Sequence, residues 1–169
     1  MFNELTLMHA LQALLLDTAW AKMATIVAAR WLIYVLPIGV LAAWYLKRVP
    51  LRALEEMFWS VLLAAVITFS AELVLGRGRP FVTDPTLVTL VPRPHTMSFP
   101  SAHASIVYAL ALTLFAWNRT WGIVALIMAD MIVVGRVVVG VHYPTDVLAG
   151  LAVGVFSFDF GFEELSVRG

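Results

Sequence analysis

A histidine and an aspartate stand close together in one of the most apolar stretches of the sequence, GRVVVGVHYPTD, residues 135–146. Pro144 favours the first position of a helix, which puts Asp146 in its first turn and His142 just before it. The carboxylate of Asp146 can then reach back to one ring nitrogen of His142, fix its tautomer and leave the other nitrogen free. An imidazole held in this way can act as a base or as a nucleophile.

A second polar stretch, FPSAHAS at residues 99–105, has the features of an anion site. Pro100 and Ser101 stand where a helix begins. The free N–H groups of Ala102 and His103 then point out of the helix end, where geometry and dipole favour an anion. His103 stands beside the same anion and can protonate a leaving oxygen.

Two arginines can complete this anion site. Arg79, in GRGRPF, and Arg136, which precedes His142 by six positions, carry permanently charged, bidentate donors suited to phosphate oxygens. Two histidines, two arginines, a hydroxyl and a helix N-terminus together predict a phosphoryl-transfer site that needs neither a metal nor another cofactor.

The composition is that of an integral membrane protein. Of 169 residues, 62% are hydrophobic and 13% are charged, whereas soluble domains are about half apolar and about one quarter charged. The net charge is zero, which argues against a nucleic-acid partner. The chain has no cysteine, which excludes disulfides, thiolate metal sites and a cysteine nucleophile. We expect one integral-membrane domain over residues 1–169.

The apolar segments must position these motifs. A spanning helix needs about 20 mostly apolar residues, and this criterion predicts an all-α, polytopic bundle of about five membrane helices at residues 20–46, 53–75, 101–117, 120–140 and 144–162. Residues 2–16 predict a helix that lies in the membrane interface. Its apolar face holds Leu5, Met8, Leu11 and Leu15, and its polar residues Asn3, His9 and Gln12 are expected to point the other way.

The connection at residues 76–100 contains five prolines and two glycines, so it cannot be a continuous helix. With five spans, this connection and the turn at 141–144 lie on the same side of the membrane as the N-terminus. The basic cluster at 47–52 lies on the opposite side, and the positive-inside rule places it in the cytoplasm. The three polar stretches then face outward.

Three short motifs of this sequence resemble the signature motifs of the type-2 phosphatidic acid phosphatase superfamily. They are RP, PSAH and R-x5-H-x3-D, and the family patterns are K-x6-RP, PSGH and SR-x5-H-x3-D. The resemblance implies that His142 forms a phosphohistidine, that Asp146 orients and charge-balances it, and that His103 is the general acid. It also implies that the phosphate is held by Arg79, Arg136, Ser101 and the backbone of Ala102 and His103.

The sequence departs from the family pattern at three positions. The family lysine falls at Glu72, the glycine of PSGH is Ala102, and the serine before the arginine is Gly135. Arg77 or Arg93 could restore the missing positive charge and pair with Glu72. Arg77 is otherwise expected to extend to the membrane interface, as long cationic side chains do.

Within the superfamily, RPF, SFPS and VGVHYPTDVLAG look most like bacterial undecaprenyl-diphosphate phosphatases. That resemblance implies hydrolysis of the isoprenoid diphosphate to its monophosphate for cell-wall synthesis. The site would face the periplasm or exterior of the bacterial inner membrane. The alternatives are phosphatidylglycerol phosphate, phosphatidic acid or a lipid A phosphate as substrate. A non-enzymatic transporter is a further alternative, with an ion path through Arg30, Glu72, Asp130 and Asp159.

Overall fold

The computed structural model describes residues 3–166, and the side chains of residues 3–161, and over this range it contains helices and no strand. The all-α fold class is therefore confirmed, and every predicted span is helical to within a few residues. The elements are α1 (Glu4–Leu15), α2 (Ala19–Ile26), the π-helical η1 (Val27–Trp31), α3 (Leu32–Tyr45), α4 (Leu51–Leu75), α5 (Pro80–Thr83), α6 (Ala102–Trp117), α7 (Arg119–Val138) and α8 (Pro144–Ser166).

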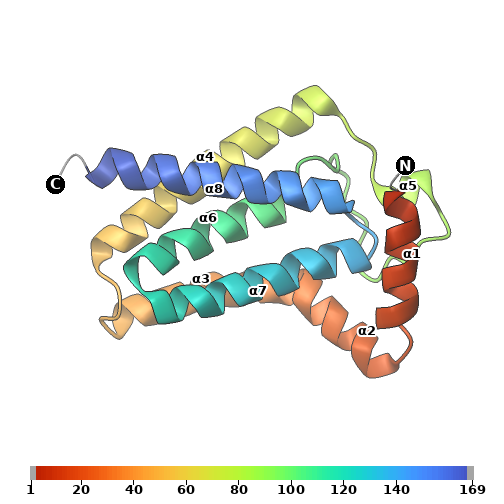
Figure 1. Ribbon diagram of the computed structural model, residues 1–169, viewed down its shortest axis with the longest axis horizontal. Helices are drawn as coiled ribbons and strands as arrows, with labels where there is room; N and C mark the ends of the chain where they lie inside the picture. Colours follow the sequence, from red (N-terminus) through yellow and green to blue (C-terminus); the bar gives the residue numbers. More distant parts are fainter. Residues whose placement is uncertain (1–2, 167–169) are drawn as a thin grey trace.

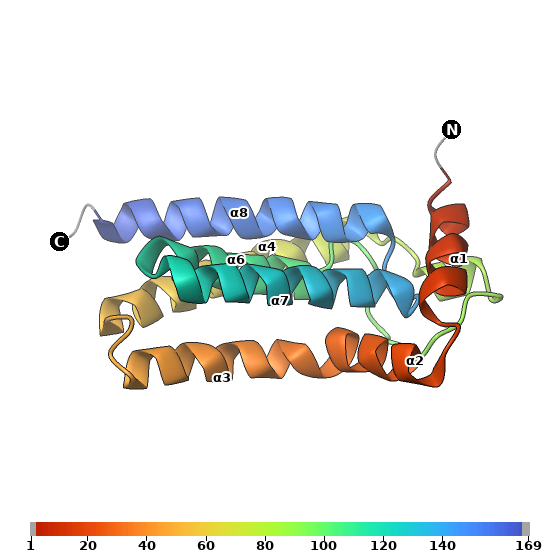
Figure 2. The same cartoon turned by 60° about the horizontal axis from the view of Figure 1, so that its bottom comes forward.

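The long helices run side by side along the long axis of the molecule, and α1 lies across one end of them (Figures 1 and 2). Helix α6 is the centre of the bundle and packs against α4, α7 and α8. Val107, Leu114 and Ile132 are among the buried side chains of the core. Many large apolar side chains are exposed instead, as a lipid-facing surface requires: Trp20, Tyr45, Phe69, Val74, Leu148 and Phe156 are examples.

Three helical segments within the described residues are long and apolar enough to cross a membrane: Ala19–Tyr45, Leu51–Thr83 and Arg119–Val138. The fourth predicted span, α6, is apolar but shorter. The fifth, α8, lies along α6 and α4 in the same bundle. The helices thus form the predicted polytopic arrangement around a central short helix.

Two glycines bring α8 close to α6. A Cβ at Gly150 would lie 2.6 Å from the carbonyl oxygen of Ser101 and from Ala104 Cβ, and a Cβ at Gly154 would lie 2.8 Å from Tyr108 Cβ. Contacts this short exclude larger side chains at both glycines. The first turns of α6 and α8 are therefore held side by side, which brings the polar stretches 99–105 and 135–146 together.

Helix α1 covers the same end of the bundle. Its Met8 is fully buried in a cluster with Leu87, Val137 and Tyr143. The prediction that Gln12 points away from the apolar face is wrong, because its side chain is buried. Its amide nitrogen donates to the carbonyl oxygens of Val138 at 2.8 Å and Val88 at 2.9 Å, so the backbone of the 76–100 connection and of α7 supplies the partners that burial requires.

Candidate active site

The three polar stretches meet at one end of the bundle, where α5, the first turn of α6 and the start of α8 converge (Figure 1). Arg79 Nη1 donates to the carbonyl oxygen of Val141 at 2.8 Å and lies 3.3 Å from Nε2 of His142. The backbone N–H of Ser101 donates to the carbonyl oxygen of Asp146 at 3.0 Å. Residues that are up to 67 positions apart in sequence thus form one cluster.

His142 is held in a single tautomer. Its Nδ1 lies 2.9 Å from the carbonyl oxygen of Ser98. A carbonyl oxygen only accepts hydrogen bonds, so Nδ1 carries the proton of the neutral ring. Nε2 then carries no proton, and its lone pair faces Arg79 Nη1 at 3.3 Å. The ring is 2% exposed, and this fixed orientation is what a nucleophile needs.

The expected hydrogen bond between Asp146 and His142 is absent from this arrangement. Asp146 Oδ2 lies 3.7 Å from His142 Nδ1, which is too long for a hydrogen bond. The same oxygen accepts instead from the backbone N–H of Tyr143 at 2.8 Å and from Ser98 Oγ. Ser98 therefore stands between the carboxylate and the imidazole, and Asp146 acts on His142 through Ser98 and through its own nearby charge.

Arg136 and Ser101 carry buried donors that have nothing to bind. Within the part of the chain that the structure describes, neither Arg136 Nε nor Ser101 Oγ has a hydrogen-bond partner. Arg136 is 7% exposed and Ser101 is fully buried, and the Arg136 guanidinium donates from Nη1 to the carbonyl oxygen of Ala29 at 3.3 Å. Unpaired buried donors are costly, so an anion with several acceptor oxygens would be stabilised here.

The glycine at the family serine position has a structural reason. A Cβ at Gly135 would lie 3.0 Å from the backbone nitrogen of Ala29 and 3.2 Å from its Cα. The π-helical segment η1 therefore approaches α7 closely at this point, and a serine would crowd it. The same approach brings the Ala29 carbonyl to Arg136.

His103 completes the cluster from α6. It is the second residue of this helix, whose N-cap Ser101 makes no side-chain capping bond. The backbone N–H groups of Ala102 and His103 belong to the first turn and so have no partner within the helix. The charges of Arg136 and Arg79 act on His103, which places its imidazole within electrostatic range of both arginines that are predicted to bind phosphate.

The surroundings keep His142 neutral. Burial is the main cause, and the positive charges of Arg136 and Arg79 add to it, while Asp146 opposes the shift. Together they lower the pKa of His142 from 6.5 to about 4. A neutral imidazole at physiological pH keeps its Nε2 lone pair, which nucleophilic attack requires.

The three accessory residues have different environments. Glu72 is partly buried and its charge acts on Arg79, so the anion at the family lysine position lies within electrostatic range of a predicted phosphate ligand. Arg93 is exposed and lies over the Phe81 ring, 5.3 Å from its centroid. Among the described residues, Glu72 and Arg93 form no ion pair with each other.

Arg77 is held by two carboxylates, although its side chain was expected to extend to the membrane interface. It pairs with Asp146 and with Glu4, each at 2.6 Å, and its guanidinium lies 3.9 Å from the centre of the Tyr143 ring. The buried carboxylate of Asp146 attracts it inward.

Several residues of the cluster were missed by sequence reasoning. Ser98 holds His142 with its carbonyl, Thr96 accepts from Arg79 with both its carbonyl and its hydroxyl, and Glu4 binds Arg77. Ser98 and Thr96 act largely through backbone atoms, which have no sequence signature. Glu4 lies more than 70 residues from its partner, so only the docking of α1 reveals it.

The charges of the transporter alternative do not come together. Asp130 accepts a 2.6 Å hydrogen bond from the Tyr108 hydroxyl, Arg30 lies over the Trp31 ring, and Asp159 borders an apolar groove on the outside of α8. All three are exposed at the helix surface, and among the described residues no ion pair joins any two of them.

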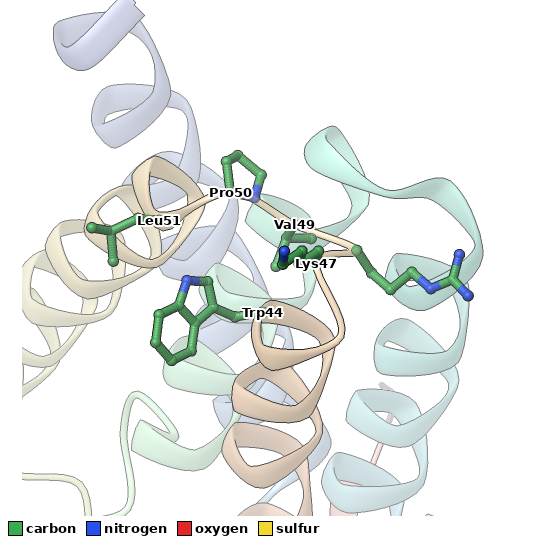
Figure 3. A pocket seen from close by; sticks show the side chains of 6 residues that line it. Trp44, Lys47, Val49, Pro50 and Leu51 are labelled. Carbon is green, nitrogen blue, oxygen red and sulfur yellow. The ribbon is translucent and has the colours of Figure 1, made fainter.

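The basic cluster at 47–52 lies at the end of the bundle opposite the candidate site (Figure 1). It forms a shallow groove at the link between α3 and α4, lined by Trp44, Lys47, Arg48, Val49, Pro50 and Leu51 (Figure 3). These cations therefore do not supply the missing family lysine. Their separation from the site matches the charge asymmetry on which the topology prediction rests.

Comparison with known proteins gives a family match over most of the bundle. Residues 54–162 match the model of the PAP2 superfamily. A bacitracin transport permease protein, BcrC, from Bacillus licheniformis is 29% identical over 142 residues, which cover 79% of this chain and 66% of that protein. An undecaprenyl-diphosphatase from Sulfolobus acidocaldarius is 39% identical over 97 residues, which cover 56% of this chain and 47% of that protein.

The fold has a solved counterpart. The crystal structure of Aquifex aeolicus LpxE superimposes with a TM-score of 0.76 at 18% identity, over 94% of each chain. Of the two curated relatives, the chain spans about two thirds of the length of the Bacillus licheniformis protein and about half of the length of the Sulfolobus acidocaldarius protein. The arrangement of the helices is therefore that of a solved structure.

Proposed function

Since the chain belongs to the PAP2 superfamily, we propose that it is an integral-membrane lipid phosphatase whose nucleophile is Nε2 of His142. The observation that carries this proposal is the pair of buried, unpartnered donors, Arg136 Nε and Ser101 Oγ, in the cluster that holds the neutral His142 ring. A phosphoryl group has the charge and the acceptor oxygens that these donors lack.

The first chemical step transfers the phosphoryl group to the protein. Nε2 of His142 forms a bond to phosphorus while the bond from phosphorus to the leaving oxygen breaks, and His103 gives its proton to that oxygen. Arg79, Arg136 and the N-terminus of α6 stabilise the negative charge on the three remaining oxygens. Arg79 also contacts Nε2 in the free protein, so a bound phosphate draws this arginine toward its own oxygens.

The second step regenerates the protein. A water molecule attacks phosphorus, His103 accepts its proton, and the N–P bond to His142 breaks to release inorganic phosphate. His142 carries a positive charge while it is phosphorylated, and the carboxylate of Asp146, 3.7 Å from Nδ1, stabilises this charge. These residues perform the cycle without a metal ion.

The substrate we favour is undecaprenyl diphosphate, which is cleaved to undecaprenyl phosphate and phosphate. Support comes from the undecaprenyl-diphosphatase named above, which is 39% identical over the matched segment, and from the exposed apolar helix surface, which suits a long isoprenoid tail. Phosphatidylglycerol phosphate, phosphatidic acid and lipid A remain the competing substrates, because the clustered donors address the phosphate and not the tail.

The same proposal includes location. The chain is a multi-pass protein of a bacterial inner membrane, with the candidate site facing the periplasm or exterior and lipids as its surroundings. The support is the position of the basic cluster at the opposite end of the bundle.

The test is phosphate release by purified protein in detergent, with excess EDTA, from undecaprenyl diphosphate and from the three competing lipids. We expect release by the wild type to persist in EDTA, to be fastest with undecaprenyl diphosphate, and to disappear in His142→Ala. Faster release from a competing lipid would change the substrate, and release by His142→Ala would remove His142 as nucleophile.

A transporter is the second candidate, and it is favoured by the similarity to the bacitracin transport permease protein of Bacillus licheniformis. It predicts that Asp130→Asn abolishes transport-linked function while His142→Ala preserves it. The phosphatase proposal predicts the reverse pattern, so both variants belong in one experiment. Export of bacitracin from cells that carry each variant measures the transport arm.

A further inference from the structure

Glu4, the first residue of α1, is tied directly to the start of α8. Its Oε1 accepts from the backbone N–H of Thr145 at 2.9 Å and from the Thr145 hydroxyl at 2.8 Å. Thr145 follows Pro144, the first residue of α8. A carboxylate from a different helix therefore caps α8, at the N-terminus where a negative charge is most stabilising.

The other oxygen of Glu4 reaches the buried carboxylate of Asp146 through one arginine. Glu4 Oε2 lies 2.6 Å from Arg77 Nη2, and Arg77 Nη1 lies 2.6 Å from Asp146 Oδ1. Asp146 is fully buried, and Arg77 is the only cation paired with it at hydrogen-bond distance among the described residues. Glu4 thus fixes the arginine that fixes Asp146.

The chain of contacts continues to the ring of His142. Ser98 Oγ donates to Asp146 Oδ2, the carbonyl oxygen of Ser98 accepts from Nδ1 of His142 at 2.9 Å, and the backbone N–H of Ser98 donates to the carbonyl oxygen of Arg77 at 2.8 Å. Every link is a hydrogen bond or an ion pair between charged or buried groups. A displacement of Arg77 therefore moves the Asp146 carboxylate and Ser98, which are the two groups that orient the imidazole of His142.

We propose that Glu4 is a positioning residue for His142: helix α1 aligns the nucleophile through Arg77, Asp146 and Ser98. This inference rests on the proposed function. It gives the N-terminal helix a part in the reaction, beyond lying across the end of the bundle. Glu4 acts on the orientation of Nε2 and not on the binding of phosphate, because its contacts are all on the side of the ring that bears Nδ1.

Helix α1 has a second, independent attachment that supplies a matched control. His9 Nε2 lies 2.9 Å from Asp84 Oδ2, in the 76–100 connection and outside the network of Glu4. Glu4→Gln and Asp84→Asn each remove one negative charge that holds α1. Only the first of them interrupts the path to His142.

The experiment compares wild type, Glu4→Gln, Glu4→Asp and Asp84→Asn in detergent. We expect Glu4→Gln to lower kcat about tenfold with KM changed less than about twofold. Glu4→Asp, which keeps the charge, should recover part of the loss, and Asp84→Asn should keep the wild-type kcat. Thermal unfolding of each variant shows whether it is folded.

Binding of two anions separates alignment from affinity and does not need turnover. Calorimetry measures the binding of both anions. Orthovanadate resembles the phosphoryl group during its transfer, so its binding requires an aligned nucleophile. Inorganic phosphate resembles the bound product. We expect Glu4→Gln to weaken the binding of vanadate about tenfold and the binding of phosphate less than about twofold.

Three results would overturn the inference: wild-type kcat and vanadate affinity in Glu4→Gln; equal losses of activity in Glu4→Gln and Asp84→Asn; or a wild type that binds no vanadate. The failure of the proposed function would look different. Wild type would then release no phosphate from any lipid, while the vanadate comparison would still report on the alignment of His142.

Discussion

Nδ1 of His142 lies 2.9 Å from the carbonyl oxygen of Ser98, and this contact decides which ring nitrogen is free to react. A backbone carbonyl cannot donate, so the proton of the neutral ring stays on Nδ1 and the lone pair on Nε2. The carboxylate of Asp146 serves as a charge 3.7 Å away and as the acceptor that holds Ser98. The partner of His142 Nδ1 is thus the backbone carbonyl of Ser98, whereas the sequence had predicted the side chain of Asp146.

The pH dependence of the reaction follows from this buried ring. Burial, with the charges of Arg136 and Arg79, lowers the pKa of His142 to about 4 against the opposing effect of Asp146. Attack requires the neutral form of His142, so we expect the acid limb of kcat/KM to fall to half near pH 4, while deprotonation of the general acid His103 lowers kcat/KM on the alkaline side. Arg79→Gln removes one of the charges that lower the pKa, and it should move this acid limb to higher pH. A wild-type limb near 6.5 would contradict the assignment.

The same pKa shift predicts how stability changes with pH. Between about 4 and 6.5 the unfolded chain binds a proton on His142 that the folded protein does not, so the free energy of unfolding falls as the pH is lowered through this window. The midpoint of thermal unfolding in detergent, measured from pH 7 to 4, should fall less steeply in His142→Ala than in the wild type. Parallel curves for the two proteins would contradict this contribution.

Ser101 should matter for binding and not for folding. Its hydroxyl is buried without a partner, so Ser101→Ala removes an unsatisfied group, and we expect the free protein to be as stable as the wild type or slightly more stable. The inhibition constant of inorganic phosphate should rise about fivefold to tenfold, for one lost hydrogen bond of about 1 kcal/mol.

The matched control is Ser105→Ala, one turn further along α6. The hydroxyl of Ser105 accepts from Thr68 at 2.8 Å and donates to the carbonyl oxygen of Ser101 at 3.1 Å. This variant should lose about 1 kcal/mol of stability and leave phosphate inhibition nearly unchanged. If Ser101→Ala destabilises the protein as much as Ser105→Ala does, Ser101 is a structural residue.

The pair of Arg77 and Asp146 should dominate the stability of this end of the bundle. Arg77→Met leaves the fully buried Asp146 carboxylate without its cation, which we expect to cost about 3 kcal/mol, the low end for a buried pair because the Arg77 side chain is 31% exposed. The double variant Arg77→Met/Asp146→Asn should lose less than the sum of the single variants.

Thermal unfolding in detergent at one scan rate measures these losses. For a chain of this size, about 3 kcal/mol corresponds to a fall of about 6–12 °C in the midpoint. Arg93→Met, which removes an exposed cation, is the control and should not shift the midpoint. Strictly additive losses from Arg77 and Asp146 would show that the two residues do not act as a pair.

The sequence was sufficient for the helices and for the residues that meet in the site. Apolar runs of sufficient length define helices whatever their partners, and the motifs at Arg79, Ser101 and His142 each carry a recognisable local geometry. Their convergence follows from chain topology, since an even number of spans separates the first motif from the third. These features depend on local pattern and could be predicted.

The contacts that orient the site could not be predicted in this way. The partner of His142 is a carbonyl of the 76–100 connection, and any residue type at position 98 would offer one. Gln12 was predicted to lie on the polar face of a surface helix, and Glu4 had no predicted role. Their contacts appear only when α1 packs across the end of the bundle. Long-range docking of short segments decides which polar groups are buried, and hydropathy does not encode it.

The orientation in the membrane can be tested because the chain contains no cysteine. Thr86 is exposed in the 76–100 connection, and Lys47 is exposed in the link between α3 and α4. The connection lies at the end of the bundle that holds the candidate site, and the link lies at the opposite end (Figure 1). The cations at 47–52 favour the cytoplasm for that end. We therefore expect Thr86→Cys to react with a membrane-impermeant maleimide in intact cells, and Lys47→Cys to react only after the membrane is opened.

The reverse pattern would place the His142 cluster on the cytoplasmic side, where a substrate diphosphate would have to be presented from the inner leaflet. Labelling of both variants in intact cells would point to damaged membranes, and an untreated cytoplasmic protein in the same cells identifies that case.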